Sequence, residues 1–410
     1  MARDNLHAWV CGEYVGRFER DFELDRPRFI YDENANRSLS IALPQNGNFD
    51  DTAPRHYLNG LLPDQPRARR QIQELTRAAS HEAWELLTAI GGDLSGGVVL
   101  HADSQGISQE TAFTSLALED QVAARIADIK QTGEPFSTAE GSPLPRFSLA
   151  GAQAKFALSI TDSGELFWSD SATPSTHIIK PESAAHSGLE LVEAATLALA
   201  RRVGIFAPAA TQFSFLGETA FMIQRFDRAP SPGTETVARL HVEDMAQALG
   251  PQAADKYQVD AAEIVDLLRR HNGEDTEAYA FFAQYVFNTL IGNADAHAKN
   301  YSIMHQQGGN VTVSPLYDAI PIGFFPGYDQ DLSMPVADEN RAGAVRQEHW
   351  LVTAREIGLD ADHVLAILRA TAEGILEHLD ATLGEVEHSR VTVERLDSLR
   401  RNAERQLRAQ

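Results

Sequence analysis

The chain changes character once along its length, and this change limits the folds that are open to it. Up to residue 228, short segments in which apolar and polar residues alternate are separated by turn-forming residues, the pattern of strands. Beyond residue 240, apolar residues recur every three or four positions, the pattern of amphipathic helices. A chain of 410 residues is also too long for one ordinary core. We therefore predict an α+β protein with a strand-rich N-terminal part and a mainly helical C-terminal part.

Composition divides the chain further. Residues 131–146 are rich in glycine, proline and serine, which is the composition of a connector. We predict an N-terminal α/β subdomain over residues 1–130, a second strand-rich part over 145–228, and a helical C-terminal lobe over 240–410.

The first part is predicted to hold strands in "HAWVCGEYVGRF" and "RSLSIAL", with Cys11 buried in the first. The segment "RARRQIQELTRAASHEAWELLTAI" predicts a helical segment that is closed by Gly91 and Gly92. In the second part, a helix from about Gly188 to Val203 separates three strands from two more. The five strands are predicted in "FSLAGAQAKFALSI", "ELFWSD", "STHIIKPE", "TQFSFLG" and "TAFMIQRFDR". The C-terminal helices are predicted in "HVEDMAQAL", "AAEIVDLLRRH", "AYAFFAQYVFNTLIG", "DHVLAILRATAEGILEHLDATL" and "VERLDSLRRNAERQL".

Charge and composition narrow the class of protein. The 58 acidic and 35 basic residues give a net charge of −23, which repels nucleic acid, so a link to DNA would require a basic partner. No apolar run approaches the roughly 20 residues of a membrane helix, and we expect no membrane association. The first residues lack the pattern of a secretory signal, and one cysteine cannot form an internal disulfide. We therefore expect a cytoplasmic protein.

A polar loop follows the most apolar of the predicted helices. The helix in "AYAFFAQYVFNTLIG" is anchored by its large apolar residues and is predicted to end near Gly292. The next residues, "NADAHAKN", contain Asp295 and Asn300 in the pattern D-x-x-x-x-N, with His297 and Lys299 between them.

A predicted hairpin brings a third oxygen-bearing side chain to this loop. The segments "YSIMH" and "VTVSPLYD" flank a turn that contains Gly308 and Gly309. Because a hairpin returns the chain to its start, Asp318 is expected beside Asn300. A carboxylate that orients a hydroxyl, with an Asn and a second carboxylate that hold Mg²⁺, is the set that kinase-type phosphoryl transfer requires. Two other interpretations are open: the loop residues are turn or capping residues, or His297 and His305 bind zinc.

A kinase also needs a cation on the nucleotide phosphates. Strand alternation in "STHIIKPE" points Lys180 into a cleft from a buried strand, a layout similar to V-A-I-K. A buried ammonium needs an acidic partner, and of Glu190 and Glu193 in the next helix we favour Glu193. The alternative is an exposed lysine at the end of a strand.

Two further segments have the composition for nucleotide contacts. "SLAGAQAK" supplies small residues that let backbone N–H groups approach phosphates, although it has one glycine and matches neither standard phosphate-binding motif. In "MIQRFDR", residues Gln224, Arg225 and Phe226 occupy the place where a hinge would bond an adenine edge through backbone groups. The alternative for this segment is a plain edge strand.

Taken together, these segments resemble the HipA family of serine/threonine kinase toxins of type II toxin–antitoxin modules. The matching segments run in order through most of the chain: "NGLLPDQP", "FSLAGAQAKFAL", "THIIKPE", "RFDR", "RLHVEDMAQALG", "IGNADAHAKN" and "PLYD". The resemblance implies a two-lobed, protein-kinase-like (HipA-like) fold that binds ATP and Mg²⁺.

The resemblance also implies roles for single residues. It makes Asp295 the catalytic base, Lys180 the phosphate-binding lysine, Asn300 and Asp318 the metal ligands, and Ser148 a site of autophosphorylation that switches the kinase off. The other nucleotide contacts that it implies are Ala150, Gly151, Ala152, Gln153, Ala154, Lys155, Gln224, Arg225, Phe226, His297, Ala298, Lys299 and Tyr317. Ala154 and Gln224 depart from the family, which has an acidic residue at the first position and a Glu at the second.

The family's partner implies how this acidic chain would reach DNA. The resemblance implies a helix-turn-helix antitoxin dimer (HipB-like) that bridges the toxin to operator DNA. It implies an aminoacyl-tRNA synthetase as the protein substrate, with the glutamyl enzyme favoured. Two other functions stay open: a corepressor in which kinase activity is secondary, and a kinase for a small molecule or lipid head group.

Overall fold

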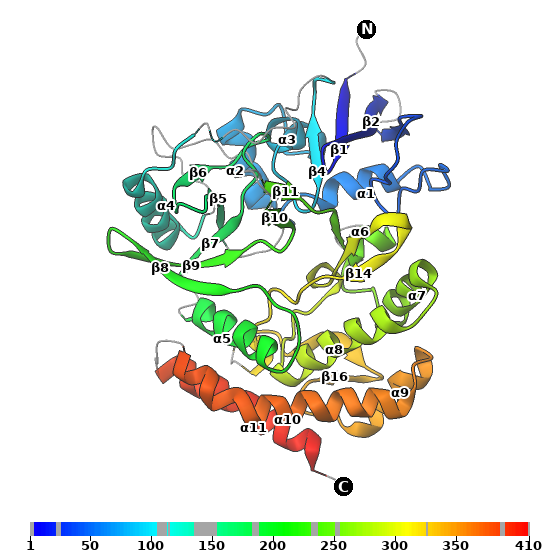
Figure 1. Cartoon of the computed structure of the whole chain (residues 1–410), viewed down its shortest axis with the longest axis vertical. Helices are drawn as coiled ribbons and strands as arrows, with labels where there is room; N and C mark the ends of the chain where they lie inside the picture. The colour runs from blue at the N-terminus through cyan, green and yellow to red at the C-terminus, as the bar shows by residue number, and fades with distance from the viewer. Residues whose placement is uncertain are drawn as a thin grey trace. The chain divides into compact units, whose positions relative to one another are not determined.

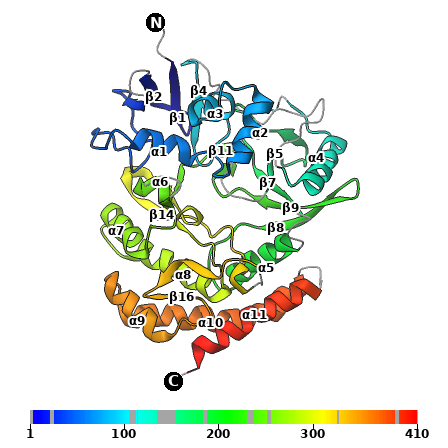
Figure 2. The same cartoon turned by 180° about the vertical axis from the view of Figure 1, so that it is seen from behind.

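The chain divides into two compact units that are interleaved along the sequence. Unit 1 comprises Met1–Ala185 and Gln212–Ala254, and unit 2 comprises His186–Thr211 and Asp255–Gln410. The computed structural model (Figures 1 and 2) describes residues 4–21, 26–104, 113, 115–134, 154–182, 188–230, 237–250, 255–324, 327–385 and 390–408.

Unit 1 begins with an antiparallel sheet of strand order β3-β2-β1-β4, packed against short helices. Its strands are β1 (Asn5–Val10), β2 (Glu13–Asp21), β3 (Arg26–Tyr31) and β4 (Val98–His101), and its helices are α1 (Ala53–Gly60), α2 (Pro66–Thr76) and α3 (Ala83–Ile90). The ring of Phe18 lies 4.6 Å from that of Phe29 and 6.2 Å from that of Tyr57 on α1. These rings belong to the apolar core that joins sheet and helices.

The second sheet of unit 1 has the strand order β6-β5-β7-β9-β8. Its strands are β5 (Phe156–Ile160), β6 (Leu166–Trp168), β7 (His177–Pro181), β8 (Ala210–Phe215) and β9 (Glu218–Gln224), and these confirm the five predicted strands. Helix α4 (Glu119–Thr132) packs on β7 and β9, and Figure 2 shows it beside this sheet. The β8–β9 turn consists of Leu216 and Gly217, both with a positive φ, as a type I′ hairpin turn requires.

Unit 2 is built on long helices around aromatic residues. Its helices are α5 (Leu189–Arg202), α7 (Ala261–Asn272), α8 (Thr276–Ile291), α9 (Gln347–Glu356), α10 (Ala361–Glu385) and α11 (Arg390–Leu407). Helix α10 contacts α5, α8, α9 and α11, and lies side by side with α11 in Figure 1. The fully buried ring of Trp350 lies 5.6 Å from Phe282 and 5.3 Å from Tyr285.

Two strand pairs complete unit 2. Strands β13 (Ser302–His305) and β14 (Val311–Val313) form the antiparallel hairpin predicted after the polar loop, with Gly308 and Gly309 in its turn. Strands β15 (Asp331–Val336) and β16 (Glu339–Arg341) form the other pair. None of the helices in the described ranges combines the length and the apolar character that a bilayer span requires.

Three local predictions for unit 1 need correction. The segment "RSLSIAL" forms only an isolated bridge between Ser40 and Leu43, because Glu243 accepts hydrogen bonds from the Ser40 hydroxyl (2.6 Å) and the Ile41 N–H (2.9 Å) in place of a partner strand. The helical segment predicted up to Gly91 and Gly92 is two helices, α2 and α3. Arg77 ends α2 in a left-handed conformation. Cys11 is only partly buried, because with φ 52° it begins the β1–β2 turn and does not lie within a strand.

The segment "HVEDMAQAL" is a strand followed by a short helix, so its prediction as one helix is also wrong. Strand β12 (Val242–Asp244) ends where Asp244 caps α6 (Met245–Leu249). The Asp244 carboxylate accepts from the Gln247 N–H (2.8 Å), and the Gln247 side chain accepts from the Asp244 N–H (3.2 Å). This reciprocal capping box fixes the first residue of the helix. A further short pair, β10 (Arg228–Pro230) and β11 (Val237–Arg239), precedes it.

Candidate functional site

The polar loop of unit 2 starts from a rigid helix end. Gly292 terminates α8 with φ 69°, and its N–H donates to the carbonyls of Asn288 and Thr289. The Asn293 N–H also donates to the Asn288 carbonyl, at 2.8 Å. This left-handed cap turns the chain sharply away from the helix and fixes the direction in which the loop leaves.

Three buried polar residues that the sequence analysis did not identify hold this loop. The Asn293 side chain donates to Oδ1 of Asn288 (3.0 Å) and to the carbonyl of Asp318 (3.2 Å). The Asn288 side chain donates to the hydroxyl of Tyr301 (3.1 Å). Burial raises the pKa of Tyr301 far above its usual range, so this hydroxyl stays protonated. The signal was present in the sequence, since an Asn within the apolar turns of "FNTLIGN" needs a buried hydrogen-bond partner.

The D-x-x-x-x-N pattern is a closed structural unit. The Asn300 side-chain N–H₂ donates to the backbone carbonyl of Asp295 at 2.8 Å, and the Asn300 N–H donates to the His297 carbonyl at 2.8 Å. Asn300 is buried within a single turn of 3₁₀ helix, Ala298–Asn300. The side chain of Asp295 is 49% exposed. The loop therefore presents one carboxylate to solvent from a fixed backbone.

The hairpin returns the chain to this loop. The Tyr317 hydroxyl donates to the Lys299 carbonyl (2.8 Å) and shares a hydrogen bond with the Ser302 hydroxyl (2.6 Å). Asp318, the next residue, has the left-handed φ of 54°, and its carbonyl is held by Asn293. The structure thus brings Tyr317 and Asp318 to the loop that carries Asp295 and Asn300. His297, Ala298 and Lys299 are buried in the same loop.

Asn300 and Asp318 have the chemistry of a Mg²⁺ site. Since the Asn300 amide nitrogen is fixed on the Asp295 carbonyl, its oxygen is the atom left to act as a ligand. Amide and carboxylate oxygens are hard ligands, and Mg²⁺ commonly takes one or two from protein and the rest from water and phosphate. Over the described residues, no group of three or more His, Cys, Asp or Glu side chains is placed to hold a metal ion. His297 and His305 therefore belong to no such group in the described ranges, and the zinc alternative has no support.

Lys180 lies in unit 1, on β7. Strand β7 pairs with β5 on one side and β9 on the other, with Lys180 opposite Phe221. Lys180 is only 4% exposed, so the alternative of an exposed lysine at a strand end is wrong. Glu190 and Glu193, on α5 of unit 2, are buried as well. The pairing of Lys180 with Glu193 stays a prediction.

The phosphate loop predicted from "SLAGAQAK" falls mostly outside the described residues. Ser148, Ala150, Gly151, Ala152 and Gln153 lie there. Ala154 and Lys155 are partly buried and lead directly into β5.

The segment "RFDR" forms a buried ion cluster in unit 1. The Arg225 guanidinium donates to both carboxylate oxygens of Asp227 (2.9 and 2.7 Å). Arg228 donates to Asp93 at 2.9 Å, and its Nη1 lies 3.1 Å from Asp227. Burial alone would raise the pKa of Asp227, but Arg225 and Arg228 outweigh burial and hold that pKa well below its usual range. The cluster ties Asp93, Leu94 and Gly96 of the N-terminal subdomain to the residues that follow strand β9 of the second sheet.

This cluster changes the interpretation of the predicted hinge. Strand β9, which ends at Gln224, lies between β7 and β8, so the alternative of a plain edge strand is wrong. The Arg225 N–H donates to the Thr176 carbonyl at 2.8 Å, and its side chain also donates to Ser175 (2.8 Å). Arg225 therefore has a structural role, and the adenine contact of Gln224 and Phe226 stays a prediction.

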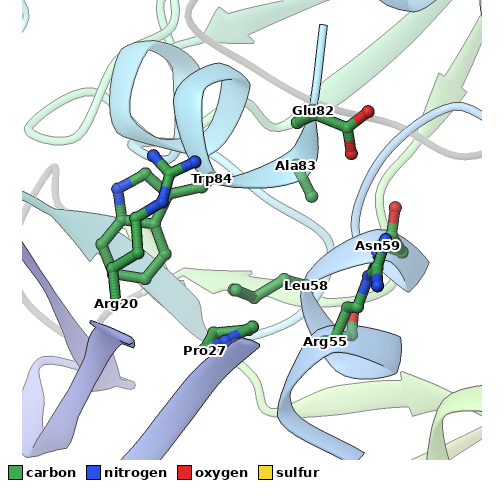
Figure 3. A pocket seen from close by; sticks show the side chains of 8 residues that line it. All are labelled: Arg20, Pro27, Arg55, Leu58, Asn59, Glu82, Ala83 and Trp84. Carbon is green, nitrogen blue, oxygen red and sulfur yellow. Dashed lines mark hydrogen bonds between the residues drawn. The ribbon is translucent and has the colours of Figure 1, made fainter. Parts of the chain in front are cut away.

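A separate cavity of about 120 Å³ lies in the N-terminal subdomain of unit 1. Figure 3 shows Arg20 stacked against Trp84 on one side of it and Arg55 and Asn59 of α1 on the other. Arg20 is engaged by Glu85 at 2.5 Å. None of the predicted site residues lines this cavity.

Comparisons with known proteins show the family of the chain. The family model described as HipA-like C-terminal domain matches residues 147–379, and the HipA N-terminal domain matches residues 6–101. A relative from Sinorhizobium fredii named "Putative kinase Y4mE" is 29% identical over 92% of each chain. The "Serine/threonine-protein kinase toxin HipA" of Shewanella oneidensis is 28% identical over 73% of this chain and 70% of its own.

A solved structure extends the likeness to the fold. HipA from the complex of Shewanella oneidensis HipA, HipB and operator DNA matches with a TM-score of 0.85 at 24% identity, over 98% of this chain and 97% of that one. The fold and the loop with its hairpin therefore define a protein of the α+β, kinase-like class, as the sequence predicted. The chain belongs to the HipA family.

Proposed function

We propose that this protein is a serine/threonine kinase toxin that transfers the γ-phosphate of ATP to a protein hydroxyl. The observation that carries the proposal is the loop of unit 2, which presents the half-exposed Asp295 carboxylate and packs against Tyr317 and Asp318. Kinase catalysis needs little covalent chemistry from the protein, so positioned oxygens of this kind supply most of what the reaction demands.

In the proposed reaction, Asp295 accepts the proton of the acceptor hydroxyl. The hydroxyl oxygen forms a bond to the γ-phosphorus, the bond from that phosphorus to the β–γ bridging oxygen breaks, and ADP leaves. Asn300 and Asp318 would hold Mg²⁺, which neutralises phosphate charge when it is bound. Lys180 is the phosphate-binding lysine in this proposal, and Glu193 its acidic partner.

The remaining contacts rest on family membership. We assign the phosphates to residues 150–155 and the adenine edge to backbone groups of Gln224 and Phe226, with autophosphorylation of Ser148 as the off switch. The parts 1–130, 145–228 and 240–410 then serve as accessory subdomain, nucleotide-binding part and catalytic lobe. We place the reaction in the cytoplasm, with a glutamyl-tRNA synthetase as the favoured acceptor.

Phosphoproteomics tests this function most directly. The purified protein is incubated with ¹⁸O-labelled ATP, Mg²⁺ and a dephosphorylated bacterial lysate, and new phosphosites are identified by mass spectrometry. We expect labelled serine or threonine in one or a few proteins and at Ser148. Label that appears only in small molecules or lipids would instead favour a metabolite kinase.

A second function is supported by the similar structure, which comes from a complex that includes HipB and operator DNA. We propose that this protein also binds a helix-turn-helix antitoxin dimer and reaches DNA through it. A gel-shift experiment with the antitoxin and its operator should show tighter DNA binding when the protein is added. If repression requires ATP turnover, this result counts against a corepressor role that is independent of catalysis.

Substitution of the metal ligands should weaken nucleotide binding only when Mg²⁺ is present. We expect Asp318→Asn, which tolerates the left-handed φ of 54°, and Asn300→Ala each to lower MgATP affinity at least about tenfold. Calorimetry with Mg²⁺ and with EDTA measures this, and the exposed Asp362→Asn serves as the control. An equal loss of affinity in EDTA would show that these residues do not act through the metal.

A further inference from the structure

A tyrosine outside the predicted site contacts the candidate base. The Tyr257 hydroxyl donates a hydrogen bond of 3.3 Å to Oδ1 of Asp295, from a different segment of unit 2. Tyr257 is 53% exposed, although its hydroxyl points at the carboxylate. Tyrosine is one of the residue types that are enriched where a protein surface receives another chain.

The position of Tyr257 is fixed by the turn that carries it. The Gln258 N–H donates to the Asp255 carbonyl at 2.8 Å, which closes the turn, and the capping box of Asp260 starts α7 directly afterwards. The Ala298 N–H approaches the Lys256 carbonyl at 3.4 Å, so this turn also borders the loop of Asp295.

Two contacts orient the ring itself. The Tyr257 and His297 rings meet edge to face, with centroids 5.1 Å apart and planes at 79°. The Lys256 ammonium lies 5.0 Å from the centroid of the Tyr257 ring, within the range of a cation–π contact. The ring is therefore held by two contacts while the hydroxyl donates to Asp295.

We propose that Tyr257 is a positioning residue of the acceptor site, an inference that rests on the proposed kinase function. Its hydroxyl holds Oδ1 of Asp295, which fixes the direction in which the second carboxylate oxygen faces the acceptor hydroxyl. Its exposed ring supports the residues that flank the acceptor serine or threonine. The hydrogen bond is longer than the usual 2.7–2.8 Å between oxygens, so the carboxylate can still move when substrate binds.

Two substitutions separate the hydroxyl from the ring. Tyr257→Phe keeps the ring and should lower kcat about two- to tenfold, the worth of one hydrogen bond, with an unchanged KM for ATP. Tyr257→Ala should in addition raise KM for the protein acceptor. Tyr279→Phe is the control, because it removes another hydrogen-bonded tyrosine hydroxyl, one that accepts from the Asp360 N–H. Tyr279 lies near the start of α8, about 20 Å along the helix from the end that leads into the loop of Asp295. A rise in kcat for Tyr257→Phe would overturn the proposal, since the hydroxyl would then be blocking the base.

A double-mutant cycle tests whether Tyr257 acts through Asp295. In an Asp295→Ala background, Tyr257→Phe should cause no further loss of the residual transfer, because the group that it positions is gone. A purely structural role would give the same fold loss in both backgrounds, and that result would refute the inference.

A measurement without turnover separates this inference from the proposed function. Coupling of carboxylates with a water-soluble carbodiimide, read by mass spectrometry, reports the reactivity of Asp295. Because Tyr257→Phe removes the hydrogen bond, it should speed the modification of Asp295 about two- to tenfold. Tyr279→Phe should leave the rate of Asp295 modification unchanged. If wild type transfers no phosphate, the kinase proposal fails while this test still decides the contact. Equal modification of Asp295 in wild type and Tyr257→Phe would overturn the positioning role.

Discussion

Replacement of Asp295 by alanine should reduce phosphate transfer to protein by about 10² to 10⁴-fold, the usual contribution of a positioned general base. The side chain is half exposed and its backbone is fixed by the Asn300 amide, so the substitution removes the reactive group without disturbing the loop. His297 Nε2 lies 3.9 Å from Oδ1 of Asp295, so the two side chains are not hydrogen-bonded to each other.

The measurement is the initial rate of transfer from γ-labelled ATP at saturating nucleotide and acceptor. Calorimetry should show that Asp295→Ala still binds MgATP, because the proposed metal ligands are Asn300 and Asp318. Asp338→Asn removes an exposed carboxylate from the same unit and should leave the rate unchanged. Wild-type rates in Asp295→Ala would exclude Asp295 as the base.

The parts of this site that the sequence predicted are those set by local patterns. Helical periodicity and Gly292 predicted where α8 ends, and the turn glycines predicted the β13–β14 hairpin. A hairpin returns the chain by geometry, so Asp318 was expected near the loop, and its carbonyl accepts a hydrogen bond from the Asn293 side chain. These inferences require only neighbours in the sequence.

The parts that the sequence did not predict depend on distant partners. Asp93 lies 135 positions from Arg228, and nothing near either residue indicates their ion pair. Tyr257 is separated from Asp295 by 38 positions, and its role appears only when the turn and the loop are folded together. Similarly, α5 lies between two strands of unit 1 in the sequence but packs with α10 in unit 2. Such contacts depend on burial and on pairing between distant segments, and the local spacing of residues in the sequence does not predict them.

The ion cluster of unit 1 should be essential for its stability. Asp227 accepts hydrogen bonds from Arg225 and from the Gly96 N–H (2.7 Å), so Asp227→Asn leaves buried guanidinium charge without its main counterion. Breaking a buried pair in this way typically costs about 3–5 kcal/mol. Urea unfolding followed by tryptophan fluorescence measures the loss, since Trp9, Trp84 and Trp168 all lie in unit 1.

The matched control and the pH dependence make this prediction specific. Glu218→Gln breaks the part-exposed pair with Lys130 in the same unit and should cost about 1 kcal/mol or less. The folded-state pKa of Asp227 lies well below the unfolded value of about 3.9, so its stabilisation is present above that value and is lost as the pH falls through the folded pKa. The difference in free energy of unfolding between wild type and Asp227→Asn should therefore be constant from pH 7 to 5 and become smaller below about pH 4. If Asp227→Asn lowers the free energy of unfolding by no more than Glu218→Gln does, the burial of Arg225 and Arg228 does not depend on this carboxylate. Packing around the cluster, rather than charge, would then join the two sheets of unit 1.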